Sequence, residues 1–390
     1  MSASSGGVEL VKRSELHSFL IGQCPSLHSS YNAPLWLQAT PVLHSVLAQK
    51  CHSPHAKVPP LSREHISVPS GGTVAIDWLG TLPSTPRAIV VGFPGTGNCH
   101  FQTGLVPTLL CALHETFGDE MAFGVAVYQG LGGLDLTSHK LPGSGYCATD
   151  DVGSVLEAAR VKFPQPVPLV VVAASFGTAL FSNFAARHVS EIEAIGVSGA
   201  LFLGFGHSVL ETVTGSDQLA IGPFGTVRGL TSKFPIKTWI KHLTKDEGKW
   251  LTALKERSPD FDCEALLRST TMFEWDRATL PAYGFDSIDA LYDAADPVRS
   301  IGKMPMPTLF VNAEDDPLCP AGRLQGSEYE RPHFAIVSTK HGGHIGWFER
   351  APCGKSHVAS HSPWLLSLTR EFIEAIPKFP KLYGSSVQRA

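Results

Sequence analysis

Short apolar runs alternate with amphipathic stretches along most of this chain. The apolar runs are rich in β-branched residues and bounded by Gly, Pro or Asp, which predicts buried strands. They lie at 88–91, 122–128, 169–173, 194–197, 308–311 and 334–337. Amphipathic stretches between them, including 150–160 and 176–187, predict helices. This alternation indicates an α/β fold with a mostly parallel central sheet and helices on both faces.

The two ends and the middle of the chain depart from that rhythm. Residues 66–69 and 73–78 flank the Gly71-Gly72 turn and predict an antiparallel hairpin that opens the sheet. Residues 365–376 predict a closing amphipathic helix that Pro377 ends. Residues 203–300 show helical patterns without strand spacing, which predicts a helical cap insertion. We therefore expect four parts: an N-terminal extension (1–34), a core (35–202 and 301–376), the cap (203–300) and a tail (377–390).

The run Leu169 to Thr178 contains the main chemical signal. A β-branched strand ends in Ala173-Ala174-Ser175-Phe176-Gly177, and a helical stretch follows. A serine on a sharp strand-to-helix turn needs small neighbours, because strand and helix pass close together there. The usual form is G-x-S-x-G, and Ala173 replaces its first glycine. Ser175 is therefore the candidate nucleophile, with a serine in an ordinary loop as the alternative.

A candidate acid and a candidate base also follow predicted strands. The loop after 308–311 carries Asp315 and Asp316, and the loop after 334–337 carries His341 and His344. The carboxyl ends of parallel strands share one edge of a sheet, where ligands bind. A serine hydroxyl needs a base to take its proton, and a carboxylate orients the imidazole.

Two pairs of candidates compete for these roles. We favour Asp316 over Asp315, because it lies four residues before Pro320 in a D-x-x-x-P pattern. We favour His344 over His341, because glycines directly precede it and let the loop approach the serine. The order serine, acid, histidine along the chain is the order typical of such triads.

An oxyanion hole needs two backbone N–H groups near the nucleophile. The first is expected from Phe176, which follows Ser175 in the chain. The second is expected from Phe93, at the end of an apolar run that breaks into a glycine-rich loop; Pro94 has no N–H to give. A phosphate cradle is the alternative for this loop, but it lacks the Lys-Ser/Thr ending and the G-x-G-x-x-G spacing.

Several motifs together resemble a known family. Residues 290–317 include a tyrosine-bearing helix, Pro307-Thr308-Leu309 and the A-x-D-D-P acid loop, and residues 342–346 read G-G-H-x-G. Residues 273–276 and 284–285 add an E-F-D-like segment and its following G-F, and residues 95–105 resemble the loop that completes the oxyanion hole. Over roughly residues 35–350 the chain is similar to the α/β-hydrolase-domain group. That group includes bacterial YheT-type hydrolases, animal lipid esterases and phospholipases, and fungal medium-chain ethyl-ester synthases.

The resemblance implies an α/β-hydrolase fold and an ester-cleaving serine enzyme. The chain differs from the family at three positions: Val91 replaces a histidine, Gln129 replaces an arginine, and Ala173 replaces the glycine of the serine turn. No cofactor and no metal are implied. The animal members often carry an N-terminal membrane anchor, which the polar start of this chain does not resemble.

Composition and charge limit the classes of binding partner that this chain is expected to have. The chain has 390 residues and a net charge of −4 without a basic block, which gives no case for nucleic-acid binding. Its apolar runs fall short of the ~18 residues that a membrane span needs, and contact with a membrane surface stays open. The eight cysteines form no C-x-x-C pair, and no signal peptide is apparent, so we expect free thiols and a cytoplasmic protein. Cys353, His357 and His361 have ligand-like spacing but lack a fourth ligand.

The expected function is hydrolysis of carboxylic esters of small-molecule or lipid type. Ser175 would form an acyl-enzyme, and Asp316 and His344 would complete the triad. The aromatic residues Phe202, Phe205 and Phe224 are expected to line an acyl pocket, with ordinary cap packing as their alternative. Two further functions are retained: acyl transfer to an alcohol at the same site, and a catalytically silent ligand receptor on this fold.

Overall fold

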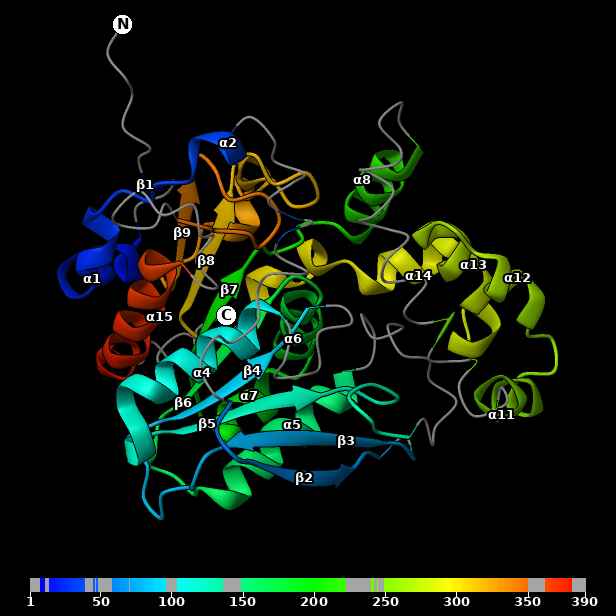
Figure 1. Cartoon of the computed structure of the whole chain (residues 1–390), viewed down its shortest axis with the longest axis horizontal. Coiled ribbons are helices and arrows are strands. Elements are labelled where there is room, and N and C mark those ends of the chain that lie inside the picture. The colour runs from blue at the N-terminus through cyan, green and yellow to red at the C-terminus, as the bar shows by residue number, and fades with distance from the viewer. Residues whose placement is uncertain are drawn as a thin grey trace, which may run out of the picture.

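The computed structural model describes most of the chain. The described residues are 8–10, 14–38, 45, 47, 58–69, 71–95, 104–135, 149–221, 240–241, 244, 249–349 and 362–380. In this part of the chain a nine-stranded sheet runs through the middle of the molecule (Figure 1), in the order β1-β9-β8-β7-β6-β4-β5-β3-β2. The strands are β1 (Val8–Leu10), β2 (Leu61–Ser67), β3 (Thr73–Leu79), β4 (Ile89–Phe93), β5 (Ala122–Val127), β6 (Leu169–Ala174), β7 (Val197–Leu203), β8 (Thr308–Ala313) and β9 (Phe334–Thr339).

The centre of the sheet is parallel and its edges are antiparallel. Strands β5, β4, β6, β7, β8 and β9 pair in parallel. At one edge β2 and β3 form the predicted hairpin, and β3 pairs antiparallel with β5. At the other edge β1 pairs antiparallel with β9. The predicted fold class, a mostly parallel sheet with helices around it, is confirmed.

Helices pack on both faces of the sheet. Successive residues of β6 show why: Val171 and Ala173 belong to one apolar core, and Val170 and Val172 to the other. The first core lies under α5, α6 and α7, and the second under α1, α4 and α15. The described helices are α1 (Glu15–Gln23), α2 (Leu35–Gln38), α4 (Leu105–Phe117), α5 (Thr149–Lys162), α6 (Phe176–Arg187), α7 (Val189–Ile195), α8 (Val209–Ile221), α11 (Lys249–Arg257), α12 (Cys263–Arg268), α13 (Met272–Tyr283), α14 (Ile288–Ala295) and α15 (Pro363–Ala375).

One predicted strand is misplaced, and one strand was missed. The strand predicted at 194–197 is wrong, because 189–195 form α7 and β7 begins only at Val197. Gly196 ends α7 in the left-handed conformation, with φ +72°, and so separates the helix from the strand. The short strand β1 lies within the predicted N-terminal extension and was not predicted.

Between β7 and β8 the described residues form helices α8 and α11–α14 and no strand. These helices lie to one side of the sheet (Figure 1). Helix α13 begins with a capping box between Thr271 and Glu274, and the Tyr292 hydroxyl on α14 donates to Asp276 on α13 at 2.9 Å. Their arrangement is compatible with the predicted cap, which remains a prediction.

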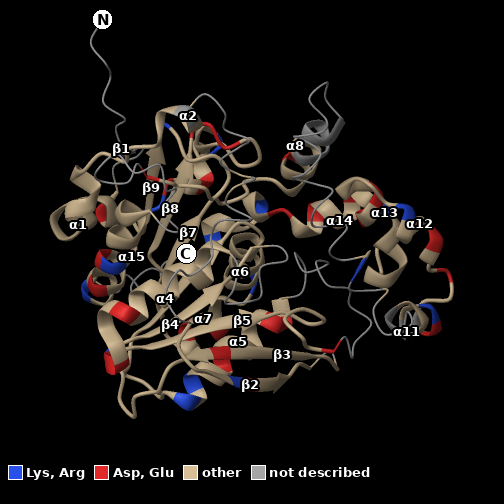
Figure 2. Ribbon diagram, viewed as in Figure 1, with Lys and Arg blue, Asp and Glu red and all other residues tan. Residues whose placement is uncertain are grey.

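Charged residues are spread over the outside of the molecule. Figure 2 shows acidic and basic residues of both signs on the outer helices and loops, whereas the central strands are almost entirely uncharged. Among the described residues, no helix combines the length and apolarity required to cross a bilayer.

Candidate active site

Ser175 lies on a sharp turn between β6 and α6. Its φ of +50° and ψ of −122° place a non-glycine residue in a strained region of backbone conformation. The Ser175 N–H donates to the Leu203 carbonyl of the neighbouring strand at 2.9 Å. The turn holds the half-buried serine at the carboxyl edge of the sheet. This is the geometry that the small-x-Ser-x-Gly pattern predicts.

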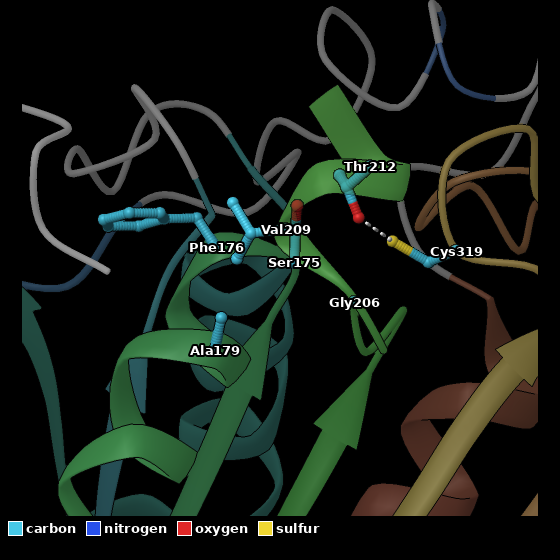
Figure 3. A pocket seen from close by; sticks show the side chains of 7 residues that line it. All are labelled: Ser175, Phe176, Ala179, Gly206, Val209, Thr212 and Cys319. Atoms are coloured by element: carbon cyan, nitrogen blue, oxygen red, sulfur yellow. Dashed lines mark hydrogen bonds between the residues drawn. The ribbon is translucent and has the colours of Figure 1, made fainter. Parts of the chain in front are cut away.

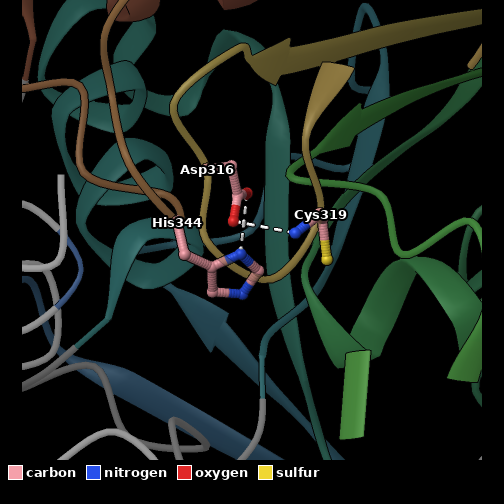
Figure 4. A group of neighbouring side chains, drawn as sticks. All are labelled: Asp316, Cys319 and His344. Carbon is pink, nitrogen blue, oxygen red and sulfur yellow. Dashed lines mark hydrogen bonds and ion pairs between the residues drawn. The ribbon is translucent and has the colours of Figure 1, made fainter. Parts of the chain in front are cut away.

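The structure brings the three predicted triad residues together. Ser175 Oγ lies 2.7 Å from His344 Nε2, and His344 Nδ1 lies 2.9 Å from Asp316 Oδ2. Asp316 and His344 are both buried. The other carboxylate oxygen of Asp316 accepts from the N–H groups of Leu318, at 2.8 Å, and of Cys319, at 2.9 Å. Figure 4 shows the second of these bonds. The carboxylate is therefore fixed by its own loop and points at the imidazole.

The rival acid and the rival base form a second, separate pair. Asp315 Oδ2 lies 3.3 Å from His341 Nδ1, and Asp315 Oδ1 accepts from the Gly343 N–H at 2.8 Å. Neither side chain is hydrogen bonded to Ser175 or His344. The His344 N–H donates to Ser45 Oγ at 2.9 Å, so two hydrogen bonds brace the glycine-rich loop. Asp315 and Ser45 thus position this loop.

Within the triad, the surrounding groups shift the pKa of His344. Burial acts to lower the pKa of His344, but the adjacent Asp316 carboxylate and the nearby Cys319 outweigh burial and raise that pKa well above its ordinary value. Burial also raises the pKa of the Cys319 thiol. The imidazolium that would form when His344 takes a proton is therefore stabilised by the carboxylate behind it.

The backbone around the predicted oxyanion hole is closely packed. Phe93 ends β4 opposite Ala173 of β6, and its buried ring lies 5.7 Å from that of Phe181. Two residues further, Gly95 lies against the serine: a Cβ there would be 3.8 Å from Ser175 Oγ. The Tyr128 hydroxyl donates to the Pro94 carbonyl at 2.8 Å and holds this segment in place. The oxyanion roles of Phe93 and Phe176 remain predictions.

A small cavity opens beside Ser175, between helices α6 and α8 (Figure 3). Thr212 Oγ1 of α8 lies 3.8 Å from Cys319 Sγ of the acid loop, so one wall joins two distant segments of the chain. Apart from the serine, the lining consists of apolar and small side chains. The lining residues are Ser175, Phe176, Ala179, Gly206, Val209, Thr212 and Cys319.

Two of the three predicted pocket aromatics, Phe202 and Phe205, do not line this cavity. Phe202 and Phe205 are fully buried, with ring centroids 5.6 Å apart, and they pack against Phe181 and Phe310 in the core. The reason is that β7 extends to Leu203, which places Phe202 on the inner side of a strand. Phe224 lies outside the described residues, as do Cys353, His357 and His361.

The cavity residues of α8 were not anticipated. Val209 and Thr212 are three positions apart on one helix, so they share a face. Their i, i+3 spacing is a signal, but the sequence does not show that this face turns toward Ser175. Ser45 was missed because nothing near it in sequence suggests a contact with a loop 299 residues later.

Known proteins are similar in sequence to this chain over most of its length. Mouse monoacylglycerol lipase ABHD2 is 25% identical over 381 residues, covering 93% of this chain and 84% of the relative. Mouse phospholipase ABHD3 is 23% identical over 348 residues, covering 85% and 76%. No protein-family model matches the chain. Among solved structures, the Pyrococcus furiosus esterase Pf2001 covers 73% of this chain and 85% of its own, with a TM-score of 0.43 and 11% identity.

The two relatives named above are animal proteins, and they match the chain over most of its length. Resemblance to the bacterial YheT-type and fungal synthase branches rests on the motifs and remains a prediction. The mostly parallel sheet and the serine turn between β6 and α6 agree with the same group. Over most of its length the chain is similar to lipid-cleaving members of the α/β-hydrolase-domain group.

Proposed function

We propose that this protein is a serine hydrolase that cleaves carboxylic esters. The observation that carries the proposal is the continuous chain of contacts from Ser175 Oγ through His344 to Asp316, at 2.7 and 2.9 Å. A hydroxyl in contact with a base that is itself oriented by a carboxylate is an activated nucleophile. The names of the relatives, a phospholipase and a monoacylglycerol lipase, support ester chemistry.

In the first half-reaction, Ser175 Oγ attacks the ester carbonyl carbon while its proton moves to His344 Nε2. Asp316 stabilises the resulting imidazolium through Nδ1. The backbone N–H groups of Phe176 and Phe93 receive the negative charge that develops on the carbonyl oxygen. His344 then gives its proton to the departing alkoxide, which leaves as the alcohol, and an acyl-enzyme remains.

In the second half-reaction, His344 takes a proton from water as that water attacks the acyl carbon. Ser175 regains its proton, and the carboxylic acid leaves. The proposed acyl site is the cavity beside Ser175, because apolar walls suit an acyl chain. Helix α8, which supplies Val209 and Thr212 to that wall, belongs to the proposed cap and would influence substrate choice.

Hydrolysis of p-nitrophenyl esters of short, medium and long acyl chains tests this proposal. Wild type is compared with Ser175→Ala and with Ser182→Ala; Ser182 is a buried serine on helix α6 whose hydroxyl donates to the Ala179 carbonyl at 3.1 Å. We expect Ser175→Ala to lose about 10⁴-fold or more in kcat and Ser182→Ala to keep turnover. Wild-type protein without turnover of any ester would contradict the proposal and favour a silent ligand receptor.

A further inference from the structure

The thiol of Cys319 lies next to the triad and transfers no proton in the proposed reaction. Its Sγ, a ring nitrogen of His344 and a carboxylate oxygen of Asp316 all lie within 4.8 Å of one another. All three residues are buried, with 3–6% of their surface exposed. Figure 4 shows the carboxylate and the sulfur next to different parts of the imidazole ring. Among the described residues, this group is unusual in combining a thiol, an imidazole and a carboxylate.

These three groups are the ligand types that zinc prefers. Zn²⁺ binds Cys sulfur at ~2.3 Å and His nitrogen or carboxylate oxygen at ~2.0–2.2 Å, usually in a tetrahedron. Ligand atoms around such an ion are therefore roughly 3.3–3.6 Å apart. To reach this spacing, atoms up to 4.8 Å apart must approach by about 1.5 Å at most, and the pair His344 Nδ1 and Asp316 Oδ2, now 2.9 Å apart, must separate slightly. Cys319 and Ser175 both line the small cavity, which gives an ion a path to the cluster.

We propose that Asp316, Cys319 and His344 form an inhibitory binding site for Zn²⁺. The inhibition rests on the proposed function, whereas the binding does not. His344 Nδ1, which already faces Asp316 Oδ2, is the ring nitrogen that binds the ion. Water fills the fourth position, because Ser175 Oγ lies at Nε2, on the other side of the ring.

Binding at Nδ1 removes the base from the reaction by changing its tautomer. The thiol of Cys319 loses one proton to solvent, and the proton of His344 moves from Nδ1 to Nε2. The ion, one thiolate and one carboxylate sum to zero charge. With a proton on Nε2, the imidazole has no lone pair to accept the Ser175 proton. The same ion also occupies the carboxylate that would stabilise the imidazolium.

The thiol should make the site selective. Soft thiolate ligands favour Zn²⁺, whereas Mg²⁺ prefers six oxygen ligands in an octahedron. We therefore expect inhibition by ZnCl₂ and none by MgCl₂ at the same concentration. A chelator such as EDTA should restore the original rate, because no covalent bond of the protein changes.

Direct binding is measured on the full chain by equilibrium dialysis against ZnCl₂ and by the sulfur-to-metal charge-transfer absorption of bound Co²⁺. The variants are Cys319→Ala and Cys319→Ser, with Cys263→Ala as a control thiol whose Sγ donates to the Leu251 carbonyl at 3.9 Å. At saturation each Cys319 variant should bind one ion fewer than wild type and lose absorption, and Cys263→Ala should match wild type. Equal stoichiometry in wild type and both Cys319 variants would overturn the proposal.

Ester hydrolysis in increasing ZnCl₂ then tests the consequence of binding, with each protein compared with its own metal-free rate. The inhibition constant for Zn²⁺ should rise at least ~10-fold in both Cys319 variants and stay unchanged in Cys263→Ala. Zinc inhibition that is equal in all four proteins would refute the assigned site. If metal-free wild type hydrolyses no ester, the proposed function fails, and the dialysis result still decides whether the metal site exists.

Discussion

Gly177 lies directly against the backbone of Phe93: a Cβ on Gly177 would be 2.2 Å from the Phe93 carbonyl oxygen and 2.7 Å from that of Pro94. Real Cβ atoms do not approach backbone oxygens so closely. The first turn of α6 and the end of β4 therefore touch, and this contact sets Ser175 beside the loop that begins at Pro94. Backbone packing therefore requires a glycine at position 177, in addition to its place in the small-x-Ser-x-Gly pattern.

Gly177→Ala should both destabilise the protein and displace the serine. Because backbone, not a flexible side chain, occupies the space, we expect a loss of about 1–3 kcal/mol in the free energy of unfolding. Urea unfolding measures this loss. The control is Gly22→Ala on α1, where a Cβ meets no atom within 4 Å. Gly22→Ala should raise the free energy of unfolding by at most about 1 kcal/mol. Equal effects of the two substitutions would contradict the packing argument.

Replacing the two neighbouring aspartates separately should distinguish their roles. Asp316→Asn loses the carboxylate that contacts His344 Nδ1, and we expect kcat to fall by about 10³–10⁴-fold. Asp315→Asn keeps a side-chain oxygen for the Gly343 N–H, so its effect on kcat should be below about 10-fold. Steady-state kinetics on one ester measures both, and a larger loss in Asp315→Asn would reverse the assignment of the acid.

The raised pKa of His344 predicts the acidic limb of the pH–rate profile. The imidazole must be neutral to accept the Ser175 proton, and a raised pKa keeps it protonated to higher pH. The value of kcat/KM should therefore rise with pH through a pKa above 6.5, the ordinary value. In Asp316→Asn the limb should move to lower pH, because burial then acts without the opposing carboxylate. A limb at or below 6.5 in wild type would contradict this electrostatic account.

Val209 should influence the preferred acyl length. Its buried side chain lines the cavity beside Ser175, so Val209→Ala should shift the preference in kcat/KM toward longer acyl chains. Val213→Ala is the matched control, because Val213 is buried on the same helix but does not line the cavity. Both variants should lose a similar stability, about 1–3 kcal/mol, and only the first should change the preference. The preference is measured with a series of p-nitrophenyl esters of different acyl length. An equal shift in both variants would contradict the assignment of this cavity as the acyl site.

The fold was largely predictable because its signals are local. Strand β6 and the serine turn follow from one apolar run and two small residues, and α6 begins and ends where the pattern predicts. The error at 194–197 arose because Ile192, Ile195 and Val197 form an apolar series that crosses from a helix into a strand. Gly196 marks the boundary, but only its left-handed φ reveals it.

The meeting of Ser175, Asp316 and His344 was predictable from the sequence, whereas the residues around them were less so. The choice of Asp316 used the distance to Pro320, and the structure places that aspartate against His344. Phe202 and Phe205 were expected in the pocket because aromatic residues near a cap suit an acyl chain. Which side of β7 faces the core depends on Phe181 and Phe310, which are distant in sequence. Long-range packing of this kind leaves no local pattern.

The most direct test of the central claim is labelling of the full chain with a fluorophosphonate probe, followed by peptide mass spectrometry. Only a serine activated by a neighbouring base reacts rapidly with such a probe. The account predicts one modified residue, Ser175, with labelling abolished in Ser175→Ala and strongly slowed in Asp316→Asn. Absence of labelling in folded wild-type protein, or modification at another serine with Ser175 untouched, would contradict it.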